Sequence, residues 1–339
     1  KLGEKLGRNK KAKKYLSSLF KFTHPSLNQK ILGINFKNPI GLAAGFDHEG
    51  KLTQITPSIG FGFHTIGSIT FGSYEGNPKP RLSRLPKSSS ILVNKGLKNT
   101  GTKNIISNLK KLKQEIPIGI SVAKTNCKTN SKENEAIQDY KKSFEIIKEL
   151  NVGDYYEINI SCPNAFGGEA FTTPNRLDAL LKEIDKLKLK KPIFLKMPCD
   201  LSTEKTIKLC EIAKKHNVQG LIFGNVTKNR KNLIFNKDEI SKAGKGNFSG
   251  LPTKENSNKL IKAVYKKYKS LFVIIGCGGI FSAEDAYEKI KLGASLVQLI
   301  TGMIYQGPQL ISQINLELEE LLEKDGFKNI KEAIGYERN

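Results

Sequence analysis

Eight short apolar runs recur along the chain, and longer amphipathic segments separate most of them. Because these runs are apolar at consecutive positions, we expect strands that are buried on both faces, as in a parallel sheet. The predicted strands comprise residues 40–44, 63–69, 118–123, 155–160, 193–197, 220–223, 272–276 and 295–300. Helical spacing is found in residues 134–150, 175–187, 203–216, 254–268 and 283–292.

The alternation of eight strands with helices predicts an α/β fold, a closed (β/α)8 TIM barrel. Two long connections, residues 70–117 and 224–271, account for much of the additional length. No internal repeat or linker divides the chain. We therefore expect one catalytic barrel domain over residues 31–339, preceded by a separate N-terminal segment of residues 1–30.

The N-terminal segment is predicted to form a basic amphipathic helix. It contains nine basic residues and one acidic residue, Glu4. The helix should end before Pro25, because proline restricts the preceding residue and cannot continue the hydrogen-bond ladder. Two interpretations remain open: the helix packs on the barrel, or it contacts an anionic membrane or a partner. The apolar side chains on one helical stripe are Leu2, Leu6, Tyr15, Leu16, Leu19 and Phe20.

The composition agrees with a globular protein. Hydrophobic residues make up 38% and charged residues 26%, and no apolar stretch is long enough for a transmembrane helix. The five cysteines are widely spaced without a C-x-x-C pair, which favours a reducing compartment over a disulfide scaffold. The net charge of +24 is compatible with a polyanionic partner, but the lysines are spread over the helical segments. We therefore favour solvated lysine-rich faces, no nucleic-acid partner and a cytoplasmic location.

The residues that directly follow the predicted strands are polar and rich in glycine, and this is where a TIM barrel builds its site. Gly278 and Gly279 follow the seventh strand, and Thr301 and Gly302 follow the eighth. Backbone amides at these two places bind phosphate in such barrels. The sequence therefore favours a ligand with a phosphate group.

Lys196 stands at the end of an otherwise apolar predicted strand. Burial of an ammonium group without a partner costs several kcal/mol, so this lysine needs an anion. One interpretation is a salt bridge to Asp47, the acid visible at the strand ends. The other is a cation that faces a group that becomes negative during a reaction, as a reduced flavin does.

Cys162 lies just beyond the fourth predicted strand, between Ser161 and Pro163. A thiol in this polar setting would be a competent general base if its pKa were slightly depressed, to roughly 7–9. None of the four histidines has metal-ligand spacing or is placed to complete a hydrolytic triad. We therefore expect no metal site and disfavour a hydrolase.

Longer motifs extend this picture. They are KNPIGLAAGFD (37–47), GFGF (60–63), EGNPKPR (75–81), RLP (84–86), GASLVQL (293–299) and AIG (333–335). In these motifs the chain resembles the dihydroorotate dehydrogenase family, and overall most the membrane-associated class that uses quinone. The resemblance implies an FMN-dependent oxidation of dihydroorotate to orotate in de novo pyrimidine (UMP) biosynthesis.

The resemblance also implies roles for individual residues. Cys162 would be the general base while hydride passes to flavin N5, Lys196 would stabilise the reduced ring, and Ser161 is the next candidate base. The FMN-binding residues would be Ala43, Ala44, Gly45, Ser68, Ser121, Asn159, Lys196, Gly224, Ser249, Gly250, Gly278, Gly279, Thr301 and Gly302. The substrate-binding residues would be Asn94, Gly96, Leu97, Asn159, Asn164 and Asn225.

Several positions depart from the quinone class. Cys162 stands where the quinone class has a serine, and the soluble classes also have a cysteine there. His48 stands where the quinone class has a lysine. Residues 94–97 read Asn-Lys-Gly-Leu where that class has Asn-Arg-x-Gly-Phe. The further replacements are Ser121 for an asparagine, Val226 for a threonine and Ile300 for a tyrosine.

These departures bear on the electron acceptor. We expect a quinone, with the N-terminal helix in peripheral contact with the anionic cytoplasmic face of the inner membrane. Of the N-terminal helical pair that lies on the membrane in the quinone class, we expect about one helix here. A soluble enzyme coupled to fumarate or to a partner protein is the alternative.

Two other enzyme classes share some of these features. A tRNA dihydrouridine synthase would combine a flavin barrel, a catalytic cysteine and positive charge, but the chain after Leu296 is expected to leave no room for a tRNA-binding domain. A phosphosugar isomerase would explain the phosphate site, but not Lys196 beside residues 159–164.

Overall fold

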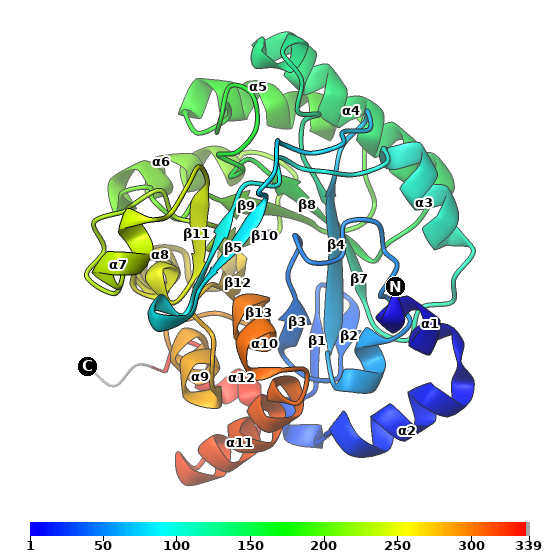
Figure 1. The fold of residues 1–339 in the computed structure, drawn as a ribbon, viewed down its shortest axis with the longest axis vertical. Coiled ribbons are helices and arrows are strands. Elements are labelled where there is room, and N and C mark those ends of the chain that lie inside the picture. Colours follow the sequence, from blue (N-terminus) through cyan, green and yellow to red (C-terminus); the bar gives the residue numbers. More distant parts are fainter. Residues whose placement is uncertain (337–339) are drawn as a thin grey trace.

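Eight parallel strands close into a barrel in the computed structural model of the chain, which describes residues 1–336 (Figure 1). In order around the barrel they are β3 (Ile40–Leu42), β4 (Phe63–Ile69), β7 (Ile118–Val122), β8 (Tyr155–Asn159), β9 (Ile193–Met197), β10 (Gly220–Phe223), β12 (Val273–Cys277) and β13 (Leu296–Leu299). The predicted TIM barrel is confirmed, and the strand ends differ from the predicted ones by at most two residues.

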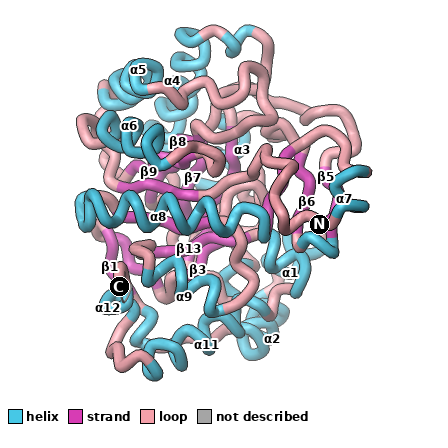
Figure 2. The backbone as a smooth tube through the Cα atoms, turned by 90° about the vertical axis from the view of Figure 1, so that its left-hand side faces the viewer, coloured by secondary structure: helices cyan, strands magenta, loops and turns pink. Residues whose placement is uncertain are grey.

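The predicted helices lie outside the strands, as Figure 2 shows. They are α4 (Glu133–Leu150), α5 (Pro174–Asp185), α6 (Thr203–Ala213), α8 (Lys254–Tyr268) and α9 (Ala283–Lys291). In α6, the Ser202 side chain caps the first turn by accepting the Lys205 N–H, and the apolar stripe that includes Leu209 is buried. The structure adds α3 (Thr102–Lys110), α7 (Lys237–Ser241), α10 (Thr301–Gln306), α11 (Leu310–Lys324) and α12 (Ile330–Ala333).

A separate apolar cluster fills the barrel near the amino ends of its strands. An antiparallel hairpin, β1 (Gln29–Ile31) and β2 (Ile34–Phe36), supplies Phe36, whose ring lies 5.4 Å from that of Phe63 in an edge-to-face arrangement. The hairpin and the cluster close this end of the barrel, so the opposite end is the one open to a ligand. The cluster consists of Phe36, Phe63, Tyr155, Phe194, Ile222, Ile275 and Leu296.

A three-stranded antiparallel sheet lies outside the barrel, with strands β5 (Leu82–Leu85), β6 (Ser90–Val93) and β11 (Asn247–Gly250). β5 and β6 come from the first long connection noted in the sequence, and β11 comes from the second. Residues of all three strands contribute to the same cavity as the barrel strand ends. The two long connections therefore build one roof over the carboxyl end of the barrel.

The N-terminal segment forms two helices, α1 (Leu2–Arg8) and α2 (Lys10–Phe20), so the prediction of a single helix was wrong. Asn9 separates them because its backbone is extended and its side chain accepts the Ala12 N–H, which caps α2. The predicted end before Pro25 is confirmed. The predicted segment boundary between residues 30 and 31 falls inside β1.

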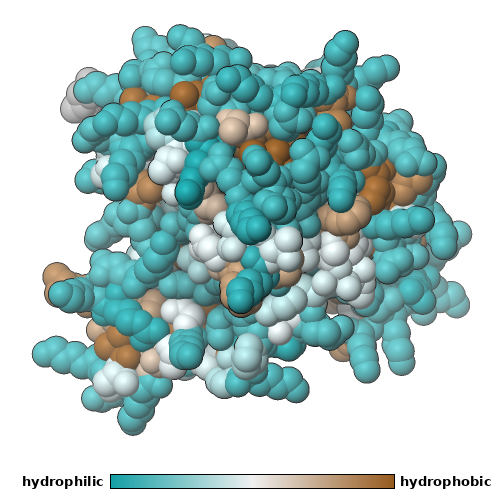
Figure 3. Space-filling model, turned by 90° about the horizontal axis from the view of Figure 1, so that it is seen from above, coloured by the Kyte–Doolittle hydropathy of each residue, from teal (hydrophilic) through white to brown (hydrophobic). Residues whose placement is uncertain are grey.

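No helix within residues 1–336 is both long and apolar enough to span a membrane. Figure 3 shows one face of the molecule, which is mostly hydrophilic with apolar side chains in small groups. Such a surface is consistent with charge spread over solvated side chains.

Candidate active site

A cavity of about 280 Å³ lies at the carboxyl ends of the barrel strands, under the β5–β6–β11 sheet. Residues that are far apart in the sequence converge on it, from the strand end after β3 to the start of α10. The residues predicted from the sequence that line the cavity are Ala43, Ala44, Gly45, Lys196, Gly224, Asn225, Ser249, Gly250, Gly278, Gly279, Thr301 and Gly302.

Backbone groups dominate one part of the lining. Gly278 and Gly279 have φ angles of +100° and +69°, a left-handed conformation that favours glycine. The Gly279 N–H donates no hydrogen bond to another group in residues 1–336. Thr301 opens α10 immediately beyond β13, and its hydroxyl lies 2.9 Å from that of Ser249. A free N–H group beside two hydroxyls suits a phosphate.

Lys196 brings a positive charge into the cavity. The residue is only 3% exposed, and within residues 1–336 its ammonium group makes no hydrogen bond or ion pair. The salt bridge to Asp47 that the sequence left open is not formed, because the Asp47 carboxylate accepts the N–H groups of Lys51 (3.0 Å) and Leu52 (2.7 Å). A buried, unpaired ammonium group fits an anionic ligand such as FMN.

A chain of hydrogen bonds connects the predicted residues deeper in the site. Ser121 and Ser68 join through their hydroxyls at 2.8 Å, and the Asn159 amide donates to Ser68 at 2.7 Å. The Ser161 hydroxyl donates to the side-chain oxygen of Asn159 at 2.8 Å, and the Asn225 amide donates to the Ser161 hydroxyl at 2.6 Å. The chain fixes the orientation of Asn159 and connects it to Asn225 at the cavity wall.

The predicted residues Asn94 and Asn164 belong to a cluster of asparagines beside the cavity. The Asn77 amide donates to the Asn94 side chain (2.9 Å) and to the Asn164 carbonyl (3.1 Å), and Asn247 donates to the Asn164 side chain (2.6 Å). Asn126 joins the cluster through Asn77. Asn77, Asn126 and Asn247 were not predicted as site residues from the sequence, although Asn77 lies in the EGNPKPR motif.

Cys162 is half-buried, on the loop that follows β8. Burial raises the pKa of its thiol to about 11, while the backbone of Asn164 and the charges of Lys124 and Lys196 act in the opposite direction. The expectation of a slightly depressed pKa was therefore wrong. Its neighbour Ser161 is buried, and its hydroxyl is occupied by Asn159 and Asn225.

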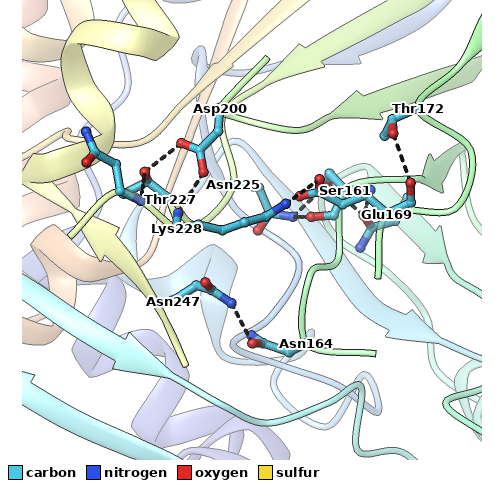
Figure 4. Close-up of polar contacts among 11 residues, drawn as sticks. Ser161, Asn164, Glu169, Thr172, Asp200, Asn225, Thr227, Lys228 and Asn247 are labelled. Atoms are coloured by element: carbon cyan, nitrogen blue, oxygen red, sulfur yellow. Dashed lines mark hydrogen bonds and ion pairs between the residues drawn. The ribbon is translucent and has the colours of Figure 1, made fainter. Parts of the chain in front are cut away.

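The Cys162 loop is connected to the loop that follows β10 (Figure 4). Glu169 from the first loop and Lys228 from the second form an ion pair of 2.6 Å. Asp200 holds the second loop by accepting the Thr227 hydroxyl and the Lys228 N–H, each at 2.6 Å. The loop that carries Cys162 is therefore positioned by contacts across the mouth of the barrel.

The loop after β6 places Lys95 in the cavity wall, although this residue was not predicted as a site residue. Its predicted neighbours Gly96 and Leu97 do not line this cavity, and their φ angles of +69° and +66° form a turn behind it. The Gly96 carbonyl accepts the Asn126 amide at 2.9 Å. The sequence feature that could have identified Lys95 is its position between Asn94, a predicted site residue, and the turn residue Gly96.

Comparison with known proteins places the chain in a family. A family model described as dihydroorotate dehydrogenase matches residues 26–322. The chain belongs to the dihydroorotate dehydrogenase family. This confirms the resemblance and the enzyme class that were drawn from the sequence motifs, and it removes the dihydrouridine synthase and isomerase alternatives.

Among relatives, the chain is 40% identical over 322 residues to the dihydroorotate dehydrogenase (quinone) of Nostoc punctiforme, which covers 92% of this chain and 84% of the relative. It is 39% identical over 335 residues to that of Crocosphaera subtropica, with 96% and 86% covered. The structure of ligand-free DHODH from Eimeria tenella superposes with a TM-score of 0.87 at 27% identity, and covers 100% of this chain and 99% of the other.

Proposed function

We propose that the protein oxidises dihydroorotate to orotate in pyrimidine biosynthesis, with FMN as its cofactor and a quinone as its electron acceptor. The observation that carries the proposal is Lys196, a buried lysine whose ammonium group has no hydrogen-bond or ion-pair partner within residues 1–336 and which lines the cavity. The names of the Nostoc and Crocosphaera relatives, which include quinone, support the acceptor.

The residues that would hold FMN divide into two groups. Gly278, Gly279 and Thr301 would hold the phosphate with N–H and hydroxyl groups, and Lys196 would place its charge at the ring. The bound cofactor would supply the hydride-accepting chemistry. A cation at the ring lowers the free energy of the transition state because negative charge develops there. Lys196 therefore contributes to the rate more than to cofactor binding.

Cys162 would accept the proton from the substrate carbon at its Sγ atom. The thiolate is the form that accepts a proton, and a raised pKa makes it a stronger base that is less populated at neutral pH. The nearby charges of Lys124 and Lys196 stabilise the thiolate. Asn159 and Asn225 would hold the substrate ring by amide hydrogen bonds while the roof sheet excludes water.

Two features support a quinone as the acceptor. First, part of the cavity wall is apolar, with Phe46, Ile300 and Ile304 and the half-exposed Leu82. Second, the loop that begins at Phe46 continues to Leu52 and Ile55, against which α1 packs. An apolar quinone gains more from such a wall than the dicarboxylate fumarate does. The N-terminal helices would bring this side of the cavity to an anionic membrane.

The test uses the FMN-loaded protein without oxygen. Addition of dihydroorotate should bleach the flavin absorbance in one rapid phase, and rapid mixing with a soluble quinone should restore it. Fumarate should not restore it on the same timescale. A flavin that dihydroorotate does not bleach would overturn the proposed reaction, whereas faster reoxidation by fumarate would overturn the acceptor.

A further inference from the structure

Two departures from the quinone class meet in space. Lys95 Nζ lies 2.8 Å from His48 Nε2 and donates to the Gly45 carbonyl at 3.2 Å. His48 occupies a position where that class has a lysine, and Lys95 belongs to the altered stretch of residues 94–97. The loop after β3 therefore lacks a lysine at position 48, and the loop after β6 supplies Lys95, whose ammonium group lies beside His48.

The partners of Lys95 are neutral. Burial and the nearby Lys95 charge lower the pKa of His48 to about 4, so at neutral pH the imidazole is uncharged and its Nε2 accepts the hydrogen bond. No carboxylate within residues 1–336 forms an ion pair with Lys95. Burial lowers the Lys95 pKa to about 8, which leaves the ammonium group mostly protonated at neutral pH but poorly solvated. Such a cation gains from an anion that enters the cavity.

Lys95 and Lys196 are the two charged residues among those described in the cavity wall. They lie on different elements, since Lys196 is in β9 and Lys95 follows β6 next to Asn94. The glycine amides after β12 and the start of α10 are already proposed to bind the FMN phosphate. Lys95, on the asparagine side of the site, is left with no assigned anion.

We propose that Lys95 binds the carboxylate of dihydroorotate and orotate, and that His48 positions it for this contact. This inference rests on the proposed function, because it takes the substrate from there. The substrate carries a permanent carboxylate, and a lysine with neutral partners can turn toward it without breaking a salt bridge. The asparagine amides recognise the polar ring, and Lys95 recognises the charge.

The experiment measures equilibrium binding of orotate and of its neutral methyl ester to the FMN-loaded protein by dialysis. The parent should prefer orotate over the ester. Lys95→Met should raise the Kd for orotate at least tenfold and leave the Kd for the ester within about twofold, so that the preference collapses. Lys95→Gln provides a second neutral variant that keeps a hydrogen-bond donor, and it should show the same collapse.

Lys98→Met is the matched control, because Lys98 lies on the same loop but is partly exposed and pairs with Glu75. It should bind both ligands as the parent does. Replacement of the positioning residue, His48→Phe, should weaken orotate binding less than Lys95→Met, again with no effect on the ester.

Unchanged orotate preference in both Lys95 variants would overturn the inference. Loss of FMN from these variants with unchanged orotate preference at saturating FMN would assign Lys95 to the cofactor and also overturn it. If the parent binds neither orotate nor the ester, the proposed function itself fails, and that result is distinct from a failure at Lys95.

Discussion

Asn159 on β8 and Lys196 on β9 are register partners in the barrel wall. Side chains at paired positions of adjacent parallel strands point to the same side, so an amide and an ammonium group reach the carboxyl end of the barrel at the same level. Asn159 is held by Ser68 and Ser161, whereas Lys196 has no hydrogen-bond partner within residues 1–336. The polar side chains of this wall suit a bound ligand, and the unpaired ammonium group of Lys196 is their most specific feature.

Replacement of Lys196 by methionine should preserve the fold, because an apolar side chain of similar length replaces a buried charge. Loss of the charge should slow flavin reduction by dihydroorotate about 10²- to 10³-fold, the usual cost of one electrostatic contact to developing charge. Anaerobic stopped-flow measurements of the flavin absorbance follow the reduction.

Lys190→Met is the control for the Lys196 variant, since Lys190 is exposed just before β9. It should reduce at the parental rate. A Lys196→Met protein that binds FMN and reduces as fast as the control would contradict the role of this lysine.

The phosphate site can be tested at Thr301, where a carboxylate would face a bound phosphate. Two like charges about 4 Å apart at an effective dielectric constant of 20 repel by about 4 kcal/mol, or roughly 10³ in affinity. Thr301→Asp should therefore lose FMN on dialysis. Thr301→Asn introduces a neutral side chain of nearly the same shape as aspartate, and this variant should retain most of its FMN. Equal FMN affinity in the two variants would place the phosphate elsewhere.

Thr301 is a better test position than Gly279. A Cβ at Gly279 would lie 2.4 Å from the Lys254 Cβ, and its φ of +69° disfavours other residues. A substitution there would disturb the loop regardless of charge.

The barrel was predictable because buried parallel strands leave apolar runs that need no tertiary information, as in residues 193–197. The roof sheet was not predictable in the same way. Leu82 and Arg84 of β5 are exposed, and β11 pairs with β6 through contacts such as that between Ser249 and Ile91, which lie 158 residues apart. Nothing local in either segment specifies that partner.

The site residues show the same difference between those that the local sequence predicts and those that long-range contacts position. Glycines and polar residues directly after strands were found because the topology of a barrel brings strand ends together. Asn77 and Lys95 were missed because each enters the site from a long loop, and only the turn at Gly96 and the contact of Asn77 with Asn164 place them there. The prediction of a slightly depressed thiol pKa was wrong for a related reason: the polar sequence neighbours of Cys162 did not reveal that the fold keeps water from its thiol.

The raised pKa of Cys162 changes the expected pH dependence of the reaction. The thiolate is the active base, and with a pKa of about 11 its population rises tenfold for each pH unit below that value. The rate of flavin reduction should therefore increase through neutral pH to at least about pH 9 without a plateau. Rapid-mixing measurements at several pH values provide the profile.

Substitutions at Cys162 separate the base from its neighbours. Cys162→Ser should retain orotate binding but lower reduction at neutral pH by about 10² or more, and Cys162→Ala should be slower still. Cys127→Ser, at another half-buried thiol, should leave the profile unchanged. Parental reduction in Cys162→Ala would move the base to another residue, with Ser161 as the next to test.

The last prediction concerns the membrane, where α1 and α2 combine two features. Leu2, Tyr15 and Leu19 are 71%, 66% and 54% exposed, and lysines such as Lys10 and Lys14 surround them. Exposed apolar side chains beside basic ones are typical of helices that lie in a membrane interface. We expect the protein to sediment with vesicles that contain phosphatidylglycerol and to be released as the salt concentration rises.

The variant that replaces Lys10, Lys11 and Lys14 by glutamine tests whether this segment, and not the overall charge of +24, causes binding. Each lysine near an anionic surface contributes about 1 kcal/mol, so the partition coefficient should fall by up to roughly 10². The control replaces Lys205, Lys237 and Lys242, three exposed lysines far along the chain, and changes the net charge equally. If both triple variants bind equally weakly, the overall charge and not the helical pair governs binding. If binding does not respond to salt, the basic face has no part in it.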